Sequence, residues 1–195
     1  MGKTPSKAQM TLWFGSRPED DETIRTKFSE HLRATSEHYA SSSSEAVVET
    51  HRAIGPEQLL ADVIALDQFT RVIHRRTANA FANDALAARL ARAALRDDVF
   101  MADADYAPLE RMFLEMPLMH SEELDDHVAL LRMRGYADDF IESVDPNGAY
   151  DDHALQHFAT IKRFGRYPYR NRVLGRADTN AERDYLSASP RTYGQ

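Results

Sequence analysis

Apolar residues spaced three or four positions apart recur along nearly the whole chain, and this spacing restricts the fold more than any other feature. In PEDDETIRTKFSEHLRATSEHYA, residues 18–40, the positions that share one side are Ile24, Phe28, Leu32, Thr35 and Tyr39. Such spacing places side chains on one face of an α-helix. No stretch of four to eight residues alternates in the way a β-strand does. The sequence therefore predicts an all-α protein.

Start and stop signals divide the chain into about seven helices. Pro56 suits a first helical turn, Gly165 suits the residue after a helix end, and TNAE at 179–182 is a capping box. We expect helices over 18–40, Pro56 to about His74, 84–96, from Pro108 with Pro117 disturbing its last turn, from a Ser121 cap through Leu131, about 149–163, and Thr179 through Leu186. Short turns between them predict antiparallel hairpins, in a stack or an irregular bundle.

The length of 195 residues predicts a single helical domain over 1–195. Within it we expect an extended N-terminal segment over 1–17, a connector over 41–55 signalled by SSSS, and a basic docking turn over 163–178. No apolar run approaches the roughly 20 residues needed to cross a bilayer, and no apolar signal segment precedes the first helix. We therefore expect a soluble cytoplasmic protein.

Charge is distributed in two opposite blocks. The chain carries 24 Lys and Arg against 31 Asp and Glu, a net charge of -7 that argues against nucleic acid as a partner. Ten acids lie between residues 97 and 126, whereas six cations and no acid lie between 159 and 176. The simpler interpretation is that the two blocks face each other and pair internally as a structural clamp. The alternative is that surplus arginines bind an anion.

The stretch RFGRYPYRN, residues 163–171, concentrates the basic block in one turn. We expect Arg163 and Phe164 to end a helix, Gly165 to turn the chain, and Pro168 to force an extended exit. The next arginines then project from a rigid corner. The sequence predicts a docking corner first and an anion site second.

Two histidine pairs have helical spacing. His153 and His157 are four apart, and His120 and His127 are seven apart with Glu123 between them. A zinc or iron site needs three or four converging ligands, and the usual metal and nucleophile motifs are absent. Cysteine is also absent. We expect no metal and no cofactor.

Four blocks together resemble the uncharacterised bacterial domain-of-unknown-function 924 family. They are WFG at 13–15, LDQFTRVIHRRTANAFANDALA at 66–87, ERMFLEMPLMHSEEL at 110–124 and HFATIKRFGRYPYRNRVLGR at 157–176, and the last helix, TNAERDYL, also fits. The resemblance covers most of the chain. It implies a tetratricopeptide-like helical fold with a groove, and no established activity.

The resemblance also marks individual positions. Those that match the family pattern are Asp67, Gln68, Phe69, Arg71, Arg75, Phe81, His120, Ser121, Glu122, His157, Arg163, Gly165, Arg166, Arg170 and Asn171. The chain departs from it where the family usually has proline, asparagine, glycine and histidine, at Thr70, Val72, Arg76 and Tyr169. If that histidine takes part in proton transfer or binds a metal, Tyr169 removes the chemistry. A tyrosine hydroxyl can replace it at an anion site.

Three functions remain open. We prefer a binding module with an Arg/His-lined cleft for a small anionic molecule or an acidic peptide. Its expected ligand-binding residues are Asp67, Arg71, Arg75, His120, Glu122, His157, Arg163, Arg166, Tyr169, Arg170 and Asn171. The alternatives are an enzyme that uses His120, Glu122 or His157 as acid/base groups or metal ligands, and a structural scaffold whose charge blocks pair internally. The sequence leaves the oligomeric state undetermined.

Overall fold

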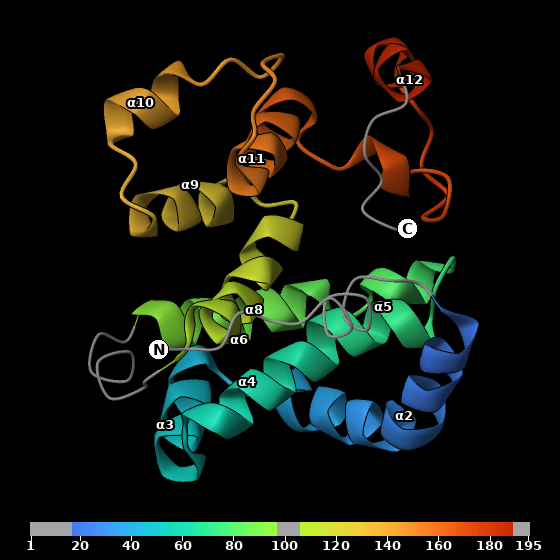
Figure 1. Ribbon diagram of the computed structural model, residues 1–195, viewed down its shortest axis with the longest axis vertical. Helices are drawn as coiled ribbons and strands as arrows, with labels where there is room; N and C mark the ends of the chain where they lie inside the picture. Colours follow the sequence, from blue (N-terminus) through green and yellow to red (C-terminus); the bar gives the residue numbers. More distant parts are fainter. Residues whose placement is uncertain (1–16, 97–105, 189–195) are drawn as a thin grey trace. The chain divides into compact units, whose positions relative to one another are not determined.

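The computed structural model describes residues 17–96 and 106–188, which form helices, turns and loops without a β-strand (Figure 1). The all-α prediction is confirmed. The chain divides into an N-terminal unit, Met1–Leu114, and a C-terminal unit, Glu115–Tyr193. The single domain and the tetratricopeptide-like stack stay predictions. The extended segment expected over 1–17 lies, except for Arg17, outside the described residues.

The N-terminal unit is built around α4 and α6. Its elements are α2 (Pro18–Ala40), α3 (Ser44–Ile54), α4 (Pro56–Ile64), the π-helical turn η1 (Ala65–Phe69), α5 (Thr70–Ile73), the 3-10 turn η2 (Ala78–Phe81), α6 (Asp84–Arg96) and the first turns of α8 (Pro108–His120). Helix α2 packs on η1 and α5, and α3 packs on α4 and α6. Leu59, Val63, Leu66 and Leu90 are fully buried in the resulting core.

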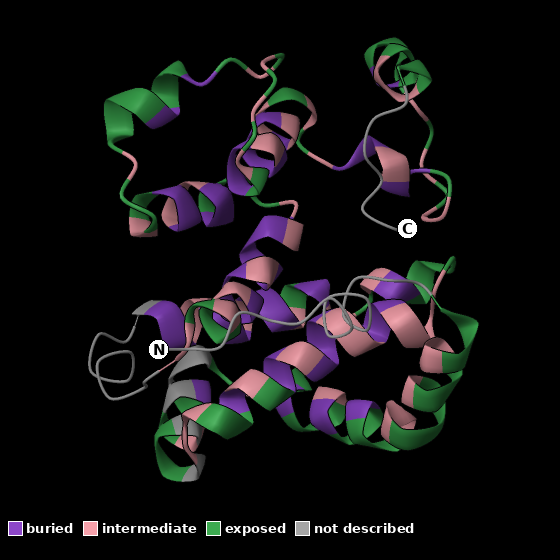
Figure 2. Ribbon diagram, in the orientation of Figure 1, coloured by how far each residue is buried: buried purple, intermediate pink, exposed green. Residues whose placement is uncertain are grey.

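Helix α2 has the bounds that its apolar spacing predicts. Figure 2 shows it as largely exposed, with buried residues on its inner side, where Leu32, Thr35 and Tyr39 lie. Arg89 on α6 donates to the carbonyl oxygens of Ser42, at 2.6 Å, and of Tyr39. Arg89 thereby satisfies the Tyr39 carbonyl in the last turn of α2 and binds the chain just beyond it.

The connector predicted over 41–55 is wrong for most of its length, because residues 44–54 form α3. Val47 is buried, and the helix packs on α4 and α6. The serine run indicated a connector, whereas the segment after it forms a short amphipathic helix. A helix of this length depends on packing more than on intrinsic helix propensity.

Residues 56–73 form one continuous helical run, as predicted, with a π-helical turn in its middle. The Thr70 N–H donates to the Ala65 carbonyl, five residues back, which widens the backbone at this point. Such turns are rare and occur frequently at functional sites. The turn carries Asp67, one of the predicted site residues.

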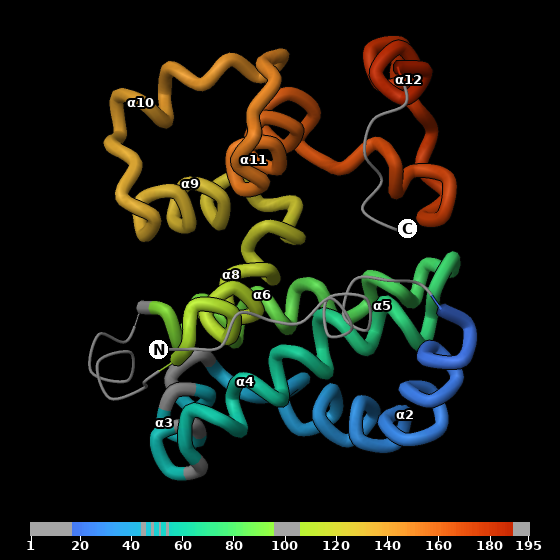
Figure 3. The backbone as a smooth tube through the Cα atoms, viewed as in Figure 1, coloured from blue at the N-terminus to red at the C-terminus, as the bar shows by residue number. Residues whose placement is uncertain are grey.

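The C-terminal unit surrounds α9 and α11. Its elements are the last turns of α8, α9 (Leu124–Met133), α10 (Asp138–Ser143), α11 (His153–Phe164), the 3-10 turn η3 (Pro168–Arg170) and α12 (Asn180–Ser187). Helices α9 and α11 pack together, and α10 packs on α9. The tube in Figure 3 follows the chain from α11 through η3 to α12. We call residues 163–178 the basic corner.

Several local signals in this unit are confirmed. Gly165 ends α11 in the left-handed conformation, with φ of 66°, and the Thr179–Glu182 capping box is complete. Helix α11 begins at His153 rather than near 149, because the Asp152 side chain accepts from the backbone N–H groups of Ala154 and Leu155.

Two expectations about the start and end of helices differ from the structure. Pro117 lies inside α8, which continues to His120. Ser121 does not cap the next helix. Its Oγ accepts from the Glu123 N–H, and α9 begins after Glu123. In the described parts of the chain, no helix combines the length and the apolar character that crossing a membrane requires.

Candidate functional site

The predicted site residues fall into the two compact units. Asp67, Arg71 and Arg75 lie in the N-terminal unit, and the rest, from His120 to Asn171, lie in the C-terminal unit. Each group is therefore a separate candidate.

In the N-terminal unit, Arg71 is held between two carboxylates. Its Nη1 lies 3.2 Å from Asp67 Oδ1 and 2.8 Å from Asp84 Oδ1, and it donates to the Asp67 carbonyl at 2.7 Å. All three side chains are nearly inaccessible to solvent. The guanidinium therefore joins the π-helical turn to the start of α6, and its charge is used within the fold.

Arg75 is also engaged. Its Nε and Nη2 donate to the two carboxylate oxygens of Asp21, at 2.9 and 3.0 Å, which ties the end of α5 to the first turn of α2. A paired guanidinium of this geometry positions a helix and leaves less donor capacity for a ligand. The N-terminal part of the predicted anion site is therefore built from internal ion pairs.

In the C-terminal unit, Glu122 fixes the basic corner in place. Its two carboxylate oxygens accept from Arg176 at 2.7 and 3.0 Å, and Oε1 also accepts from the Tyr167 N–H at 2.8 Å. Burial opposes ionisation of this carboxyl, but the hydrogen bonds from Arg176 and Tyr167 outweigh it and lower its pKa. Glu122 is thus an ionised anchor, and the acidic and basic blocks do meet at this point.

A second ion pair closes the other end of the corner. Arg166 Nε and Nη2 donate to the Glu182 carboxylate at 2.6 and 2.8 Å, and Nη2 also donates to the Ala177 carbonyl. The hydrogen bond from Arg166 lowers the pKa of Glu182, to which the Thr179 N–H also contributes. Glu182 therefore completes the N-terminal cap of α12 and also anchors the basic corner.

Tyr167 connects the corner to the interior through His157. Its hydroxyl donates its single proton to the Met119 carbonyl and lies 2.7 Å from His157 Nδ1. The hydroxyl therefore accepts from His157, so Nδ1 carries the imidazole proton and Nε2 carries the lone pair. Burial, and then the neighbouring His120, His127 and Arg170, hold the pKa of His157 well below its usual range.

His127 is the buried histidine that the predicted site omitted. Its Nε2 lies 2.9 Å from the Ser121 carbonyl and must donate to it, which leaves Nδ1 as an acceptor. No described residue donates to Nδ1. Burial lowers the pKa of His127 to about 4. Both buried imidazoles are consequently neutral at pH 7.

The predicted histidine geometry is only partly realised. His120 ends α8 and His127 lies on α9, so they do not share one helical face as their spacing suggested. On α11, His157 is buried while His153 is exposed. The His120 and His157 rings do approach, with centroids 6.2 Å apart. Within residues 17–96 and 106–188, no group of three or more potential ligands is placed to hold a metal ion.

Arg170 is buried in the same interior region. Only 3% of it is exposed, its guanidinium lies 4.5 Å from the Tyr167 ring centroid, and Nη2 donates to the His120 carbonyl at 3.0 Å. Tyr169, where the family resemblance implies histidine, packs against Tyr167 with ring centroids 5.3 Å apart and the rings tilted by 38°. The neighbouring Asn171 donates to Asp178 at 2.7 Å. These residues pack the corner onto the unit.

Arg163 differs from the other arginines of the predicted site. It is exposed, and its guanidinium lies 4.6 Å from the Phe164 ring centroid and 5.8 Å from that of Tyr185. The two rings are 5.0 Å apart, so α11 and α12 together support the guanidinium. It has no hydrogen bond or ion pair with any residue that the structure describes. Arg163 is therefore held in place with its N–H edges available.

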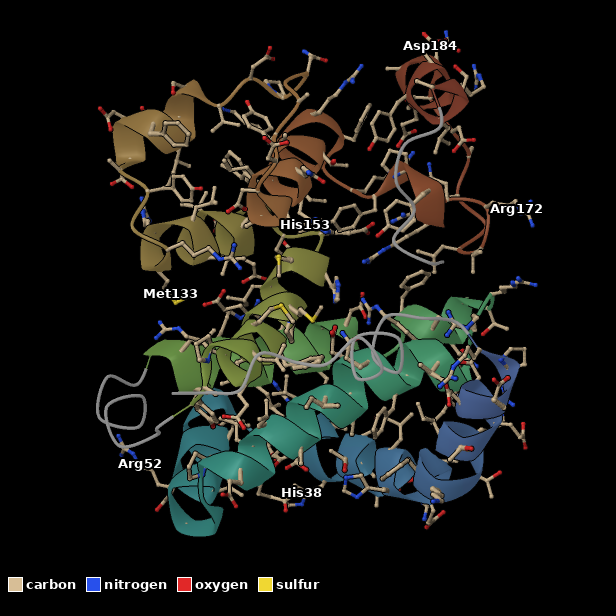
Figure 4. The ribbon with its side chains drawn as sticks, viewed as in Figure 1. His38, Arg52, Met133, His153, Arg172 and Asp184 are labelled. Atoms are coloured by element: carbon tan, nitrogen blue, oxygen red, sulfur yellow. The ribbon has the colours of Figure 1, made fainter. Side chains whose placement is uncertain are left out.

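Arg172 provides a contrast on the same corner. Figure 4 shows it on the outer loop between η3 and α12, pointing away from α11. It is exposed and makes no ion pair or ring contact within the described part of the chain. Arg172 carries the same charge as Arg163 without the aromatic support.

Comparisons with known proteins were consistent with this family-level resemblance. The model of the family described as "Bacterial protein of unknown function (DUF924)" matches residues 2–189. The solved structure of a protein of unknown function from Agrobacterium tumefaciens is similar, with 29% identity over 93% of this chain and 92% of that chain and a TM-score of 0.72. No curated protein matches the chain.

Proposed function

Because the chain belongs to the DUF924 family of bacterial proteins of unknown function, whose description names no activity, we propose a function from its own residues. It is a binding module that holds a small anionic molecule or an acidic peptide on the basic corner. The module acts in the cytoplasm, and the groove of a tetratricopeptide-like stack is its wider setting.

The observation that carries the proposal is the state of Arg163. A guanidinium recognises a carboxylate or a phosphate through its N–H edges, and stacking on aromatic rings restricts its rotamers beforehand. Arg163 combines both properties: its rings hold it at 4.6 and 5.8 Å, and no described residue occupies its donors. An anion that binds Arg163 therefore meets N–H donors on a side chain whose conformational freedom is already restricted, so less entropy is lost on binding.

The other arginines of the site support this contact indirectly. Arg166 and Arg176 are committed to Glu182 and Glu122, which fixes both ends of the corner. A rigid corner keeps Arg163 and its rings in one geometry. In this proposal Arg163 is the binding residue, and the paired arginines are positioning residues.

Proton transfer in the interior is a second candidate function. His157 is neutral, its proton is fixed on Nδ1 by Tyr167, and its ring lies 6.2 Å from that of His120. The neutral imidazole has a defined lone pair that can accept a proton, but its lowered pKa makes it a weak base. Glu122 is a weaker candidate because Arg176 and Tyr167 already occupy its oxygens.

Thermal denaturation in the presence of anions tests the binding proposal. The probes are inorganic phosphate, succinate and an acetylated tetra-aspartate peptide. Saturation at about 100 times the dissociation constant adds roughly 2.7 kcal/mol to the free energy of unfolding. We expect at least one probe to raise Tm, and Arg163→Gln to abolish the increase.

Arg172→Gln is the matched control, because it removes the same charge from the same corner without touching the aromatic support. It should retain the increase in Tm. Equal losses in both variants would mean that only general charge attracts the probe. No increase with any probe would leave the basic corner as a purely structural clamp.

A further inference from the structure

A stacked pair of aromatic rings lies on the surface of the C-terminal unit. The Tyr136 and Phe140 centroids are 5.2 Å apart with an interplanar angle of 18°, and Phe140 is 42% exposed. Large apolar side chains with this exposure are uncommon on the described surface, where Leu124 is the other example. An exposed aromatic ring of this kind is a frequent anchor of interaction surfaces.

The helix that carries Phe140 is firmly attached. Lys162 on α11 donates to the carbonyl oxygens of Glu142, at 2.7 Å, and Val144, at 2.9 Å, at the C-terminal end of α10. Ile141, the next residue of α10, is buried. Phe140 is therefore exposed although the helix that carries it is anchored by Lys162 and by the buried Ile141.

The surroundings of the aromatic pair are acidic. Asp139 adjoins Phe140, and the Tyr136 hydroxyl lies 3.4 Å from Asp152, whose carboxylate is also 3.5 Å from Arg134 Nη1. Between residues 135 and 161 the chain has no lysine or arginine, and its acids are Asp138, Asp139, Glu142, Asp145, Asp151 and Asp152. Arg132 compensates Asp138, whereas among the described residues Asp139 accepts only from the adjacent Phe140 N–H. A partner that binds this face therefore needs a cationic group that can also pack against an aromatic ring.

The same chain contains such a cation. Arg163 lies beside aromatic rings, and no residue in the described ranges occupies its N–H edges. A guanidinium pairs with carboxylates and stacks on rings at the same time. Both surfaces belong to the C-terminal unit, so every copy of the chain offers one of each. The acidic surface of one copy is therefore complementary in charge to the basic surface of another.

We infer that Tyr136, Asp139 and Phe140 of one copy dock on Arg163 of a second copy. Asp139 takes the guanidinium edge, and the Phe140 ring packs beside it. The inference rests on the proposed function, since it makes the acidic segment of a second copy the ligand of Arg163. Exposed ion pairs contribute little individually, so the association is weak and sensitive to salt.

Sedimentation velocity of the full chain over a concentration series tests the inference. The sedimentation coefficient should rise with concentration at 20 mM salt and lose this dependence at 500 mM salt. Asp139→Arg and Arg163→Glu should each abolish the rise, because like charges then face each other. Phe140→Ala should weaken it without changing the net charge.

Mixing the two reversed variants gives the decisive result. Asp139→Arg retains Arg163, which meets the intact Asp139 of the other variant, and its new arginine meets the new glutamate. The mixture should therefore associate, although neither variant does so alone. Glu19→Arg reverses an exposed acid in the first turn of α2, a similar helical position, and should leave association unchanged.

Three results would overturn self-docking: a monomer at every concentration, unchanged association in the single variants, or no recovery in the mixture. Unaltered circular dichroism and Tm in the single variants ensure that a loss is not due to unfolding. The proposed function is judged separately by the small-anion shift. A monomer that still shows an Arg163-dependent shift retains an anion site with another ligand.

Discussion

Replacing Arg76 by glycine should stabilise the protein. Arg76 has φ of 63° and is the non-glycine residue in the left-handed region among the residues described. This conformation costs an L-residue about 1–2 kcal/mol because Cβ crowds the following carbonyl. The side chain is exposed and makes no hydrogen bond, ion pair or ring contact with the described residues, so its removal breaks no such interaction there. Glycine also enlarges the unfolded ensemble, at a cost of about 0.4–1 kcal/mol.

The net gain therefore lies between about 0 and 1.6 kcal/mol, with a midpoint of about 0.8 kcal/mol. For a chain of this size, 1 kcal/mol corresponds to about 2–4 °C in Tm, so differential scanning calorimetry should detect an increase of about 1–4 °C. The change also restores the residue that the family resemblance implies at this position. We expect the same direction of change from urea denaturation, with an unchanged m-value.

Arg76→Ala is the control, because it removes the same charge but keeps Cβ. It should give no increase, since the strain remains. If alanine stabilised the protein as much as glycine, the gain would come from the lost charge. If glycine lowered Tm, the reasoning from backbone strain would be refuted.

Three further changes test the fold around the two candidate sites. Thr179→Ala removes half of the capping box and should cost about 1 kcal/mol in chemical denaturation. Arg71→Ala leaves buried Asp67 and Asp84 without their cation and should cost about 3–5 kcal/mol by the same measurement. The folded-state pKa of His127 is about 4, against 6.5 for the free group. Below pH 6.5 the unfolded chain therefore binds a proton at His127 that the folded protein does not. The free energy of unfolding, unaffected by this group above pH 6.5, falls by up to about 3 kcal/mol as the pH drops to 4. His127→Gln should flatten this part of the stability–pH curve, and an unchanged slope would show that His127 is not the group responsible.

Local signals in the sequence predicted much of the fold. The bounds of α2 and α6, the left-handed Gly165 and the capping box at Thr179 all depend on residues within a few positions of one another. Helix α3 was missed because its stability comes from packing on α4 and α6, which no window of sequence contains.

The partners of the site residues were harder to predict because they are distant in sequence. Arg176 and Glu122 are 54 residues apart, and Arg166 and Glu182 are 16 apart. The two charge blocks indicated that such pairs exist but not which members form them. The helical spacing of His120 and His127 was misleading, because the chain leaves the helix at Ser121.

The pairing of the basic corner changes which residue its anion chemistry depends on. A cation that already serves a carboxylate offers a ligand little, because the ligand must first displace that partner. Arg166 and Arg176 are in this position, with Glu182 and Glu122. Arg163 is stacked on Phe164, and a ligand displaces nothing there among the described residues. Loss of a paired arginine should therefore appear as lower stability, and loss of Arg163 as lost binding at unchanged stability.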